Sequence, residues 1–165
     1  MKKILLIAND STYVFNLRKE LLEGMIAEGY TVHVLCEKKN HTEKLESMGC
    51  TLHYMTVNRQ GKNPLQDVSL YKCFADTISK IAPDVVLTYN IKPNIYAALY
   101  CGKKNIPCLV NVCGLGNPVE NPGLLQKLTC FLYKQGVKKA SCVFFQNTAN
   151  RDFFIERGMI KENAN

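Results

Sequence analysis

The chain has 165 residues, of which 47% are hydrophobic and 21% charged, so a disordered, collagen-like or coiled-coil protein is excluded. The net charge is +7, and most of the excess lies after Ala82, which favours an anionic partner. Short apolar runs alternate with amphipathic stretches. In chain order they predict strand 3–8, helix 15–28, strand 31–36, helix 42–48, strand 52–57, helix 65–81, strand 85–88, helix 93–104, strand 108–112, helix 124–138, strand 142–145 and helix 148–157.

This alternation predicts one architecture. Strands that read as continuous apolar runs are covered on both faces, and parallel strands need helical crossovers of right-handed sense. We therefore expect an α/β domain with a doubly wound, Rossmann-like parallel sheet over residues 1–160. Residues 161–165 are polar and are predicted to begin a linker.

No apolar run has the length of a secretory signal core or a membrane-spanning helix, so we expect a cytoplasmic protein. The eight cysteines show no CxxC spacing and lie mostly in apolar runs, which predicts reduced, mostly buried thiols. The three histidines have no metal-ligand spacing. The loop after the first strand lacks the GxGxxG fingerprint. We therefore predict neither a metal nor a dinucleotide cofactor.

Ligands of open parallel sheets bind at the carboxyl ends of the strands, so the loops there carry the candidate residues. Asn9 and Asp10 follow the first strand, and Ser11 or Thr12 is predicted to cap the next helix.

Lys92 and Asn94 flank a proline after the fourth predicted strand. There a cation and an amide beside free backbone donors suit a phosphate or sugar hydroxyls, although a simple capped turn explains them equally well. After the fifth predicted strand, Gly114 and Gly116 permit close backbone approach to a ligand, or mark an unusual turn. Cys113 precedes them and, with no histidine later in the chain, reads as a packed thiol rather than a nucleophile.

The stretch 124–139 is basic and amphipathic. It predicts either a core helix with a solvated face or a helix lying on a membrane surface. No nucleic-acid-binding motif accompanies it, so we expect no nucleic-acid partner.

Several segments together resemble the N-terminal half of family 4 glycosyltransferases of the GT-B fold, in the branch that builds bacterial capsule, O-antigen and other surface polysaccharides. The matching segments run in family order and are 3–10, Asn58-Arg59-Gln60-Gly61-Lys62-Asn63-Pro64, 83–89, Ile91-Lys92-Pro93-Asn94-Ile95-Tyr96, Val110-Asn111-Val112-Cys113-Gly114-Leu115-Gly116 and 145–147 with Arg151-Asp152.

The resemblance implies a retaining hexosyltransferase that takes a sugar from a nucleotide-sugar donor to a saccharide or lipid-diphosphate-linked acceptor, with peripheral contact to the inner face of the plasma membrane. It implies that this chain is the acceptor-side GT-B half and that a C-terminal donor domain lies outside it. Asn9, Asp10, Lys92 and Asn94 would then contact the acceptor. The loop of Cys113, Gly114 and Gly116 would approach the donor.

Two departures from the family pattern concern catalysis. Many members have glycines in the first loop, where this chain has Asn9 to Thr12, and many have a histidine where Cys113 stands. No catalytic residue is therefore assigned. The resemblance implies that the leaving phosphate itself accepts the acceptor proton. A non-catalytic α/β module that binds a sugar or phosphate is the alternative, and the residues alone leave it open.

Overall fold

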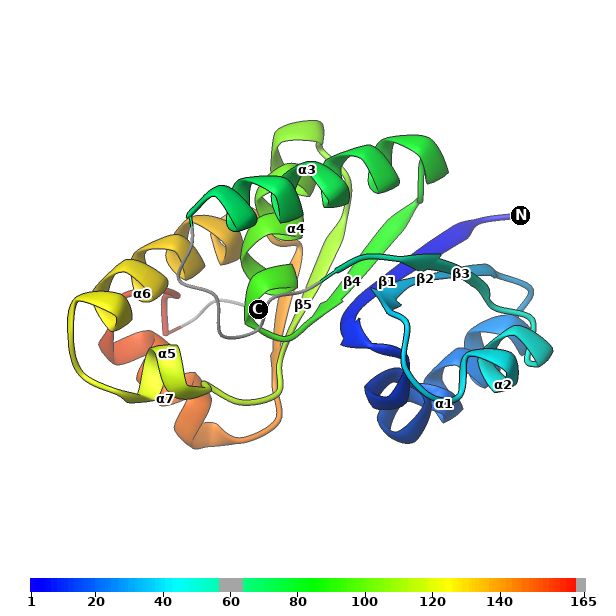
Figure 1. The fold of residues 1–165 in the computed structure, drawn as a ribbon. Coiled ribbons are helices and arrows are strands. Elements are labelled where there is room, and N and C mark those ends of the chain that lie inside the picture. Colours follow the sequence, from blue (N-terminus) through cyan, green and yellow to red (C-terminus); the bar gives the residue numbers. More distant parts are fainter. Residues whose placement is uncertain (57–63, 163–165) are drawn as a thin grey trace. The chain divides into compact units, whose positions relative to one another are not determined.

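The computed structural model describes residues 1–56 and 64–162. Its elements alternate as predicted (Figure 1): β1 Lys3–Asp10, α1 Ser11–Ala27, β2 Thr31–Glu37, α2 Thr42–Ser47, β3 Thr51–Tyr54, α3 Pro64–Ile81, β4 Val85–Tyr89, α4 Ile91–Lys104, β5 Cys108–Val112, α5 Asn117–Glu120, α6 Leu124–Val137, β6 Cys142–Phe145 and α7 Thr148–Glu156. Of the segment 58–64 only Pro64, the first residue of α3, is described, and the predicted linker 161–165 is described only to residue 162.

The six strands form a parallel sheet in the order β3-β2-β1-β4-β5-β6. This is the order of doubly wound nucleotide-binding folds, so the predicted fold class is confirmed. Helix α5, a single helical turn that follows Gly116, was not predicted from the sequence.

Two predicted helix starts were wrong. Helix α1 begins at Ser11, directly after β1, because Asp10 ends the strand in extended backbone and caps the helix. Helix α4 begins at Ile91, so Pro93 is its third residue. Proline is tolerated there because the first N–H groups of a helix have no intrahelical acceptor.

The chain divides into two compact units, Met1–Leu87 and Thr88–Asn165. In the first unit, Leu5, Leu6 and Ile7 of β1 are completely buried, and β1 pairs with β2 in register from Lys3↔Thr31 to Ile7↔Leu35. Figure 1 shows α1 and α2 on one face of these strands and α3 on the other. Burial on both faces explains why β1 is apolar at successive positions.

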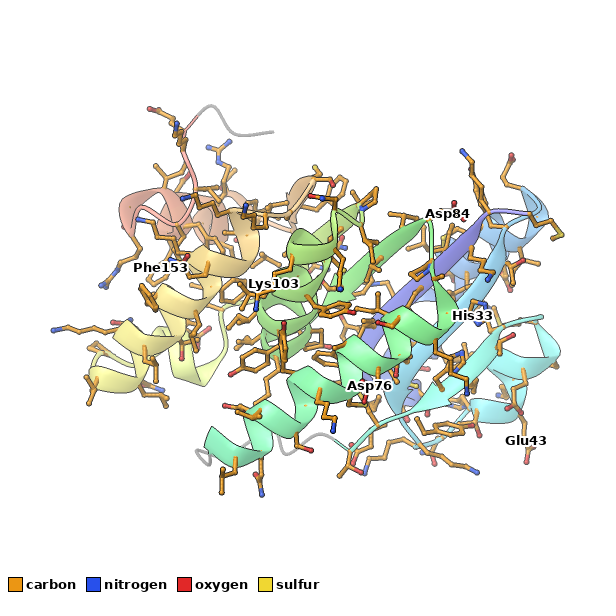
Figure 2. All side chains as sticks on the ribbon, turned by 90° about the horizontal axis from the view of Figure 1, so that it is seen from above. His33, Glu43, Asp76, Asp84, Lys103 and Phe153 are labelled. Carbon is orange, nitrogen blue, oxygen red and sulfur yellow. The ribbon has the colours of Figure 1, made fainter. Side chains whose placement is uncertain are left out.

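The start of β1 is held at the entry to β4 by two hydrogen bonds. The Lys3 N–H donates to the Asp84 carboxylate at 2.7 Å, and the Asp84 N–H donates to the Lys3 carbonyl at 2.9 Å. Figure 2 labels Asp84 at this end of the sheet.

In the second unit, the core contains a cluster of aromatic rings. Phe154 of α7 meets the rings of Tyr133 and Phe145 edge to face, with centroids 5.0 and 5.1 Å away, a favoured geometry for aromatic pairs. Helices α4 and α6 pack closely because Gly136 has no side chain: a Cβ there would lie 2.9 Å from the Asn94 carbonyl oxygen.

The cysteines are free thiols, half of them buried and half partly exposed. Burial and the neighbouring Asp10 raise the pKa of the Cys36 thiol to about 12. Within the part of the chain that is described, no helix is both long and apolar enough to cross a membrane.

Candidate functional site

The first unit has an open pocket of about 480 Å³ at the carboxyl end of β1. Its lining comes from the β1–α1 turn, the first turns of α1 and the segment after β2, and consists of Asp10, Thr12, Tyr13, Asn16, Leu17 and Lys39. The pocket thus lies where the doubly wound topology places ligands.

Asp10 builds the turn that shapes this pocket. Its Oδ1 accepts a hydrogen bond of 2.7 Å from the Tyr13 N–H, so Asp10 is the helix cap and the prediction of Ser11 or Thr12 was wrong. The reason is that β1 continues to residue 10 and leaves no loop before α1. Asp10 still lines the pocket, although only 8% of it is exposed.

Ser11 joins two segments that are distant in sequence. Its buried hydroxyl accepts a hydrogen bond from the Lys39 N–H and donates one to the Asn40 carbonyl, both at 2.9 Å. This contact holds Lys39 at the pocket edge. The Lys39 ammonium lies 3.7 Å from the Glu37 carboxylate, with about half of the lysine side chain exposed (52%). An exposed pair at that distance is weak, so the ammonium remains available to an anionic ligand.

Tyr13 is held in place by Arg18, one and a half turns along α1. The guanidinium Nη2 donates to the Tyr13 hydroxyl at 3.1 Å, and the guanidinium carbon Cζ lies 5.6 Å from the centre of the tyrosine ring. The pocket wall is therefore an aromatic ring with a cation behind it, a combination that suits the apolar face of a sugar and its hydroxyls. Asn9 is half-buried and is not part of the pocket lining.

In the second unit, Lys92 and Asn94 follow β4, and their side chains have different environments. Lys92 lies in the first turn of α4 and is half-buried. Asn94 is completely buried, and its Nδ2 donates to the Asn111 carbonyl and to the Tyr133 hydroxyl, both at 2.8 Å. Asn94 therefore links α4 to β5 and α6. Its side chain has no exposed surface and supports the packing of this unit, and the acceptor contact that the sequence predicted for it stays a prediction.

The Asn94–Tyr133 contact has an electrostatic consequence. Burial raises the pKa of the Tyr133 hydroxyl, while the Asn94 hydrogen bond partly opposes that shift. The tyrosine is thus neutral at physiological pH, and its hydroxyl serves as a hydrogen-bonding group in the core rather than as an acid or base.

The segment after β5 holds the predicted donor-side residues. Cys113 is half-buried, with its Sγ 3.8 Å from the Asn111 carbonyl. Gly114 is exposed, and a Cβ there would meet nothing within 4 Å. Gly116 directly precedes α5 and has a φ of 67°, and its carbonyl accepts hydrogen bonds from the Val119 and Glu120 N–H groups of that helix. A helix-start turn therefore explains Gly116 without a ligand, whereas nothing within the described protein requires glycine at 114.

Sequence reasoning missed Tyr13, Asn16, Leu17 and Lys39. Thr12 and Asn16 are four residues apart, as are Tyr13 and Leu17, so a helix that begins at Ser11 places each pair on one side. That spacing could have identified them as pocket residues. Lys39 carried no local signal, because the Ser11 contact that places it joins residues 28 apart. Among residues 1–56 and 64–162, no cluster of three or more His, Cys, Asp or Glu side chains is placed to hold a metal ion.

Comparison with known proteins identifies the family of this chain. Residues 3–147 match the family model described as Glycosyl transferase 4-like. The chain belongs to this family. No curated protein matches the sequence.

Solved structures show the fold of this Glycosyl transferase 4-like domain in longer proteins. A glycosyltransferase from Rickettsia africae has 18% identity and a TM-score of 0.70, with 99% of this chain and 41% of that chain covered. Anabaena HepE, solved with UDP and glucose, has 16% identity and a TM-score of 0.64, covering 96% and 41%. A UDP-GlcNAc 2-epimerase from Methanocaldococcus jannaschii has 13% identity and a TM-score of 0.61, covering 97% and 43%. The 165 residues thus span about two fifths of these structures.

Proposed function

We propose that this domain is the acceptor-side half of a retaining glycosyltransferase. The enzyme moves a hexose-type sugar from a nucleotide-sugar donor to a saccharide carried on a lipid diphosphate, in the synthesis of a surface polysaccharide. The observation that carries the proposal is the family match over residues 3–147, together with an open pocket at the carboxyl end of β1. HepE, which has the same fold, was solved with UDP and glucose.

In this proposal the pocket of the first unit receives the acceptor. The Asp10 carboxylate and the Asn16 amide face its sugar hydroxyls, Asn9 lies beside them at the end of β1, and the Lys39 ammonium faces an acceptor phosphate. The exposed charge of Lys39 and the aromatic wall of Tyr13 support this assignment. In the second unit, Lys92 is proposed as a further cation for the acceptor, and the loop of Cys113, Gly114 and Gly116 as the donor-side segment.

The proposed reaction needs no protein base. The bond between the anomeric carbon and the nucleotide phosphate breaks, the acceptor oxygen bonds to that carbon on the same face, and the acceptor proton passes to the leaving phosphate oxygen. The domain contributes by positioning the acceptor hydroxyl and holding its charged group. The nucleotide is proposed to bind mainly to a second domain outside these 165 residues.

The pocket assignment is tested by NMR titration of the isotope-labelled chain with a short-chain prenyl diphosphate sugar and, separately, with UDP. We expect the amides of 10–17 and Lys39 to shift with the acceptor analogue and to respond much less to UDP. Lys39→Ala should weaken the acceptor analogue about 10- to 150-fold, the value of one charge-assisted hydrogen bond, and Lys92→Ala by less. Lys72→Ala, an exposed lysine of α3, is the matched control.

Equal losses for Lys39→Ala and Lys72→Ala would show that the pocket is not the acceptor site. Analysis of the products formed by the longer enzyme, with its proposed donor domain, distinguishes sugar transfer from epimerisation and from binding alone. A transferred sugar supports the proposal, an epimerised nucleotide sugar places the protein with the structurally similar epimerases, and binding without turnover identifies a non-catalytic module.

A further inference from the structure

The pocket of the first unit carries charges of opposite sign at two places. Asp10 contributes a carboxylate at the end of β1, where the residue is only 8% exposed. Lys39 contributes an ammonium at the pocket edge, where about half of its side chain (52%) is exposed. Water and salt screen a buried charge less than an exposed one. The carboxylate therefore acts more strongly on a ligand inside the pocket than the ammonium does at the edge.

The place of Asp10 in the fold gives this charge its importance, because helix α1 begins at the next residue. The N-terminus of a helix usually attracts anions, since its first N–H groups have no intrahelical acceptor and the positive end of the helix dipole lies there. Here the Asp10 Oδ1 already accepts a hydrogen bond of 2.7 Å from the Tyr13 N–H. A phosphate that approached this turn would therefore lie beside a like charge.

Neighbouring groups show how far this charge reaches and which cations oppose it. In β2, burial and then Asp10 raise the pKa of the Cys36 thiol to about 12, because a thiolate there would lie near the carboxylate. On α1, the Arg18 guanidinium is occupied by its hydrogen bond to the Tyr13 hydroxyl and is not part of the pocket lining. Among the lining residues, Lys39 supplies the cation.

We propose that Asp10 selects the chemical group that enters this pocket. Its carboxylate accepts hydrogen bonds from the hydroxyls of a neutral sugar and repels phosphate, so the charged group of the same ligand stays at the edge beside Lys39. The pocket thereby sets the direction in which such a ligand binds, with its sugar inward and its phosphate outward. The identity of that ligand as the acceptor rests on the proposed function, whereas the exclusion of anions follows from this pocket alone.

A role as helix cap alone would also explain the hydrogen bond between Asp10 and Tyr13. The two explanations differ in what the charge does, and asparagine caps a helix about as well as aspartate without a charge. Asp10→Asn should therefore melt close to the unchanged chain and differ from it in the ligands that the pocket admits. Asp10→Ser supplies a second neutral cap with a shorter side chain.

NMR titration of the isotope-labelled chain with inorganic pyrophosphate tests the exclusion of anions. In the unchanged chain, we expect pyrophosphate to shift the amide of Lys39 and to leave the amide of Thr12, in the first turn of α1, nearly unmoved. In Asp10→Asn and Asp10→Ser, the Thr12 amide should shift as well. Pyrophosphate should bind these variants about tenfold more tightly or better, because one like charge is removed from beside a multivalent anion.

Asp76→Asn is the matched control for the change in net charge. Asp76, which Figure 2 labels on α3, is exposed and lies outside the pocket lining. Its charge is screened by solvent, so the affinity of this variant for pyrophosphate should stay within about twofold of that of the unchanged chain.

Three results would overturn the proposal: equal affinity of the unchanged chain and both Asp10 variants for pyrophosphate, the same gain in Asp76→Asn, or a shift of the Thr12 amide by pyrophosphate in the unchanged chain. The prenyl diphosphate sugar is titrated separately. If it does not shift the pocket amides while Asp10→Asn still gains affinity for pyrophosphate, the acceptor assignment is wrong and the exclusion of anions by Asp10 is supported.

Discussion

At the scale of single residues, burial decides which polar side chains are structural. The sequence predicted Asn94 as an acceptor contact and Ser11 as a helix cap, yet both are completely buried and form two hydrogen bonds each. A buried polar group without partners is costly, so these hydrogen bonds help to hold neighbouring segments together. Lys39 and Asn16, by contrast, line an open pocket and are available to a ligand.

Asn94→Ala should destabilise the domain by about 1–3 kcal/mol, because the Asn111 carbonyl and the Tyr133 hydroxyl lose their common donor in the core. Tyr133→Phe removes only one of these contacts and should cost less. Urea denaturation of both variants measures the difference. If Asn94→Ala unfolds like the unchanged chain but loses affinity for the acceptor analogue, Asn94 is a binding residue after all.

Ser11→Ala should lower the free energy of unfolding by about 1–3 kcal/mol, since it leaves the Lys39 N–H without its side-chain acceptor. Ser47→Ala is a matched control, because the Ser47 hydroxyl also donates to a carbonyl, at 2.8 Å, but on the exposed end of α2. Its effect should stay within about 0.5 kcal/mol. Similar losses in the two variants would mean that the Ser11 contact adds nothing beyond a surface hydrogen bond.

At the scale of elements, neighbouring strands and helices meet through a few specific contacts. His33 of β2 and His53 of β3 join two strands through ring nitrogens 3.1 Å apart, and Figure 2 labels His33 within this part of the sheet. Gly136 lets α6 approach the backbone of α4. The packing of β2 on β3 therefore depends on the two histidines, and the packing of α6 on α4 depends on glycine at position 136.

The histidine pair should make the fold less stable in mild acid. Burial, then His53 and Lys3, lower the pKa of His33, and burial and Lys80 lower the pKa of His53. The unfolded chain therefore binds protons first, and the free energy of unfolding should fall as the pH drops through about 6.5 and below.

Urea denaturation at several pH values between 7 and 5 measures this dependence. The free energy of unfolding of the variant H33Q/H53Q should fall less over that range than that of the unchanged chain. The carboxylates are the same in both proteins, so their contribution cancels in the comparison. An identical pH dependence in both proteins would show that the pair is not the cause.

Gly136→Ala should destabilise the domain by about 1–3 kcal/mol through overpacking. The added Cβ would lie 2.9 and 3.0 Å from the backbone carbonyl oxygens of Asn94 and Ile95, which cannot move like the end of a side chain. Gly24→Ala in α1 is the matched control, because nothing lies within 4 Å of its Cβ position. That variant should gain about 0.5–1 kcal/mol from helix propensity. Thermal melts that rank the two variants in the opposite order would contradict the close α4–α6 contact.

At the scale of the whole molecule, the chain belongs to the Glycosyl transferase 4-like family and spans about two fifths of the structures that share its fold. The pocket of the first unit brings charged and hydrogen-bonding side chains to the carboxyl end of β1.

The purified 165-residue chain should lack transferase activity, because the proposed donor domain is absent from it. Incubation with a panel of nucleotide sugars and the acceptor analogue, followed by mass spectrometry, measures turnover. The enzyme with both domains, assayed in parallel, is the positive control. Turnover by the 165-residue chain at a comparable rate would refute the proposal that a second domain is needed to bind the donor.

The sequence alone determined the alternation of strands and helices, the parallel sheet and the family, because these follow from local apolar periodicity and short motifs. The ends of β5 and β6 were predicted to the residue. The start of α1 was not, because Ser11 and Thr12 are equally good caps by type, and only the length of β1 selects Asp10. The pocket edge at Lys39 and the burial of Asn94 arise from contacts between distant segments. Only the tertiary structure decided them, since the same residue type is structural when buried with partners and functional when left at an open surface.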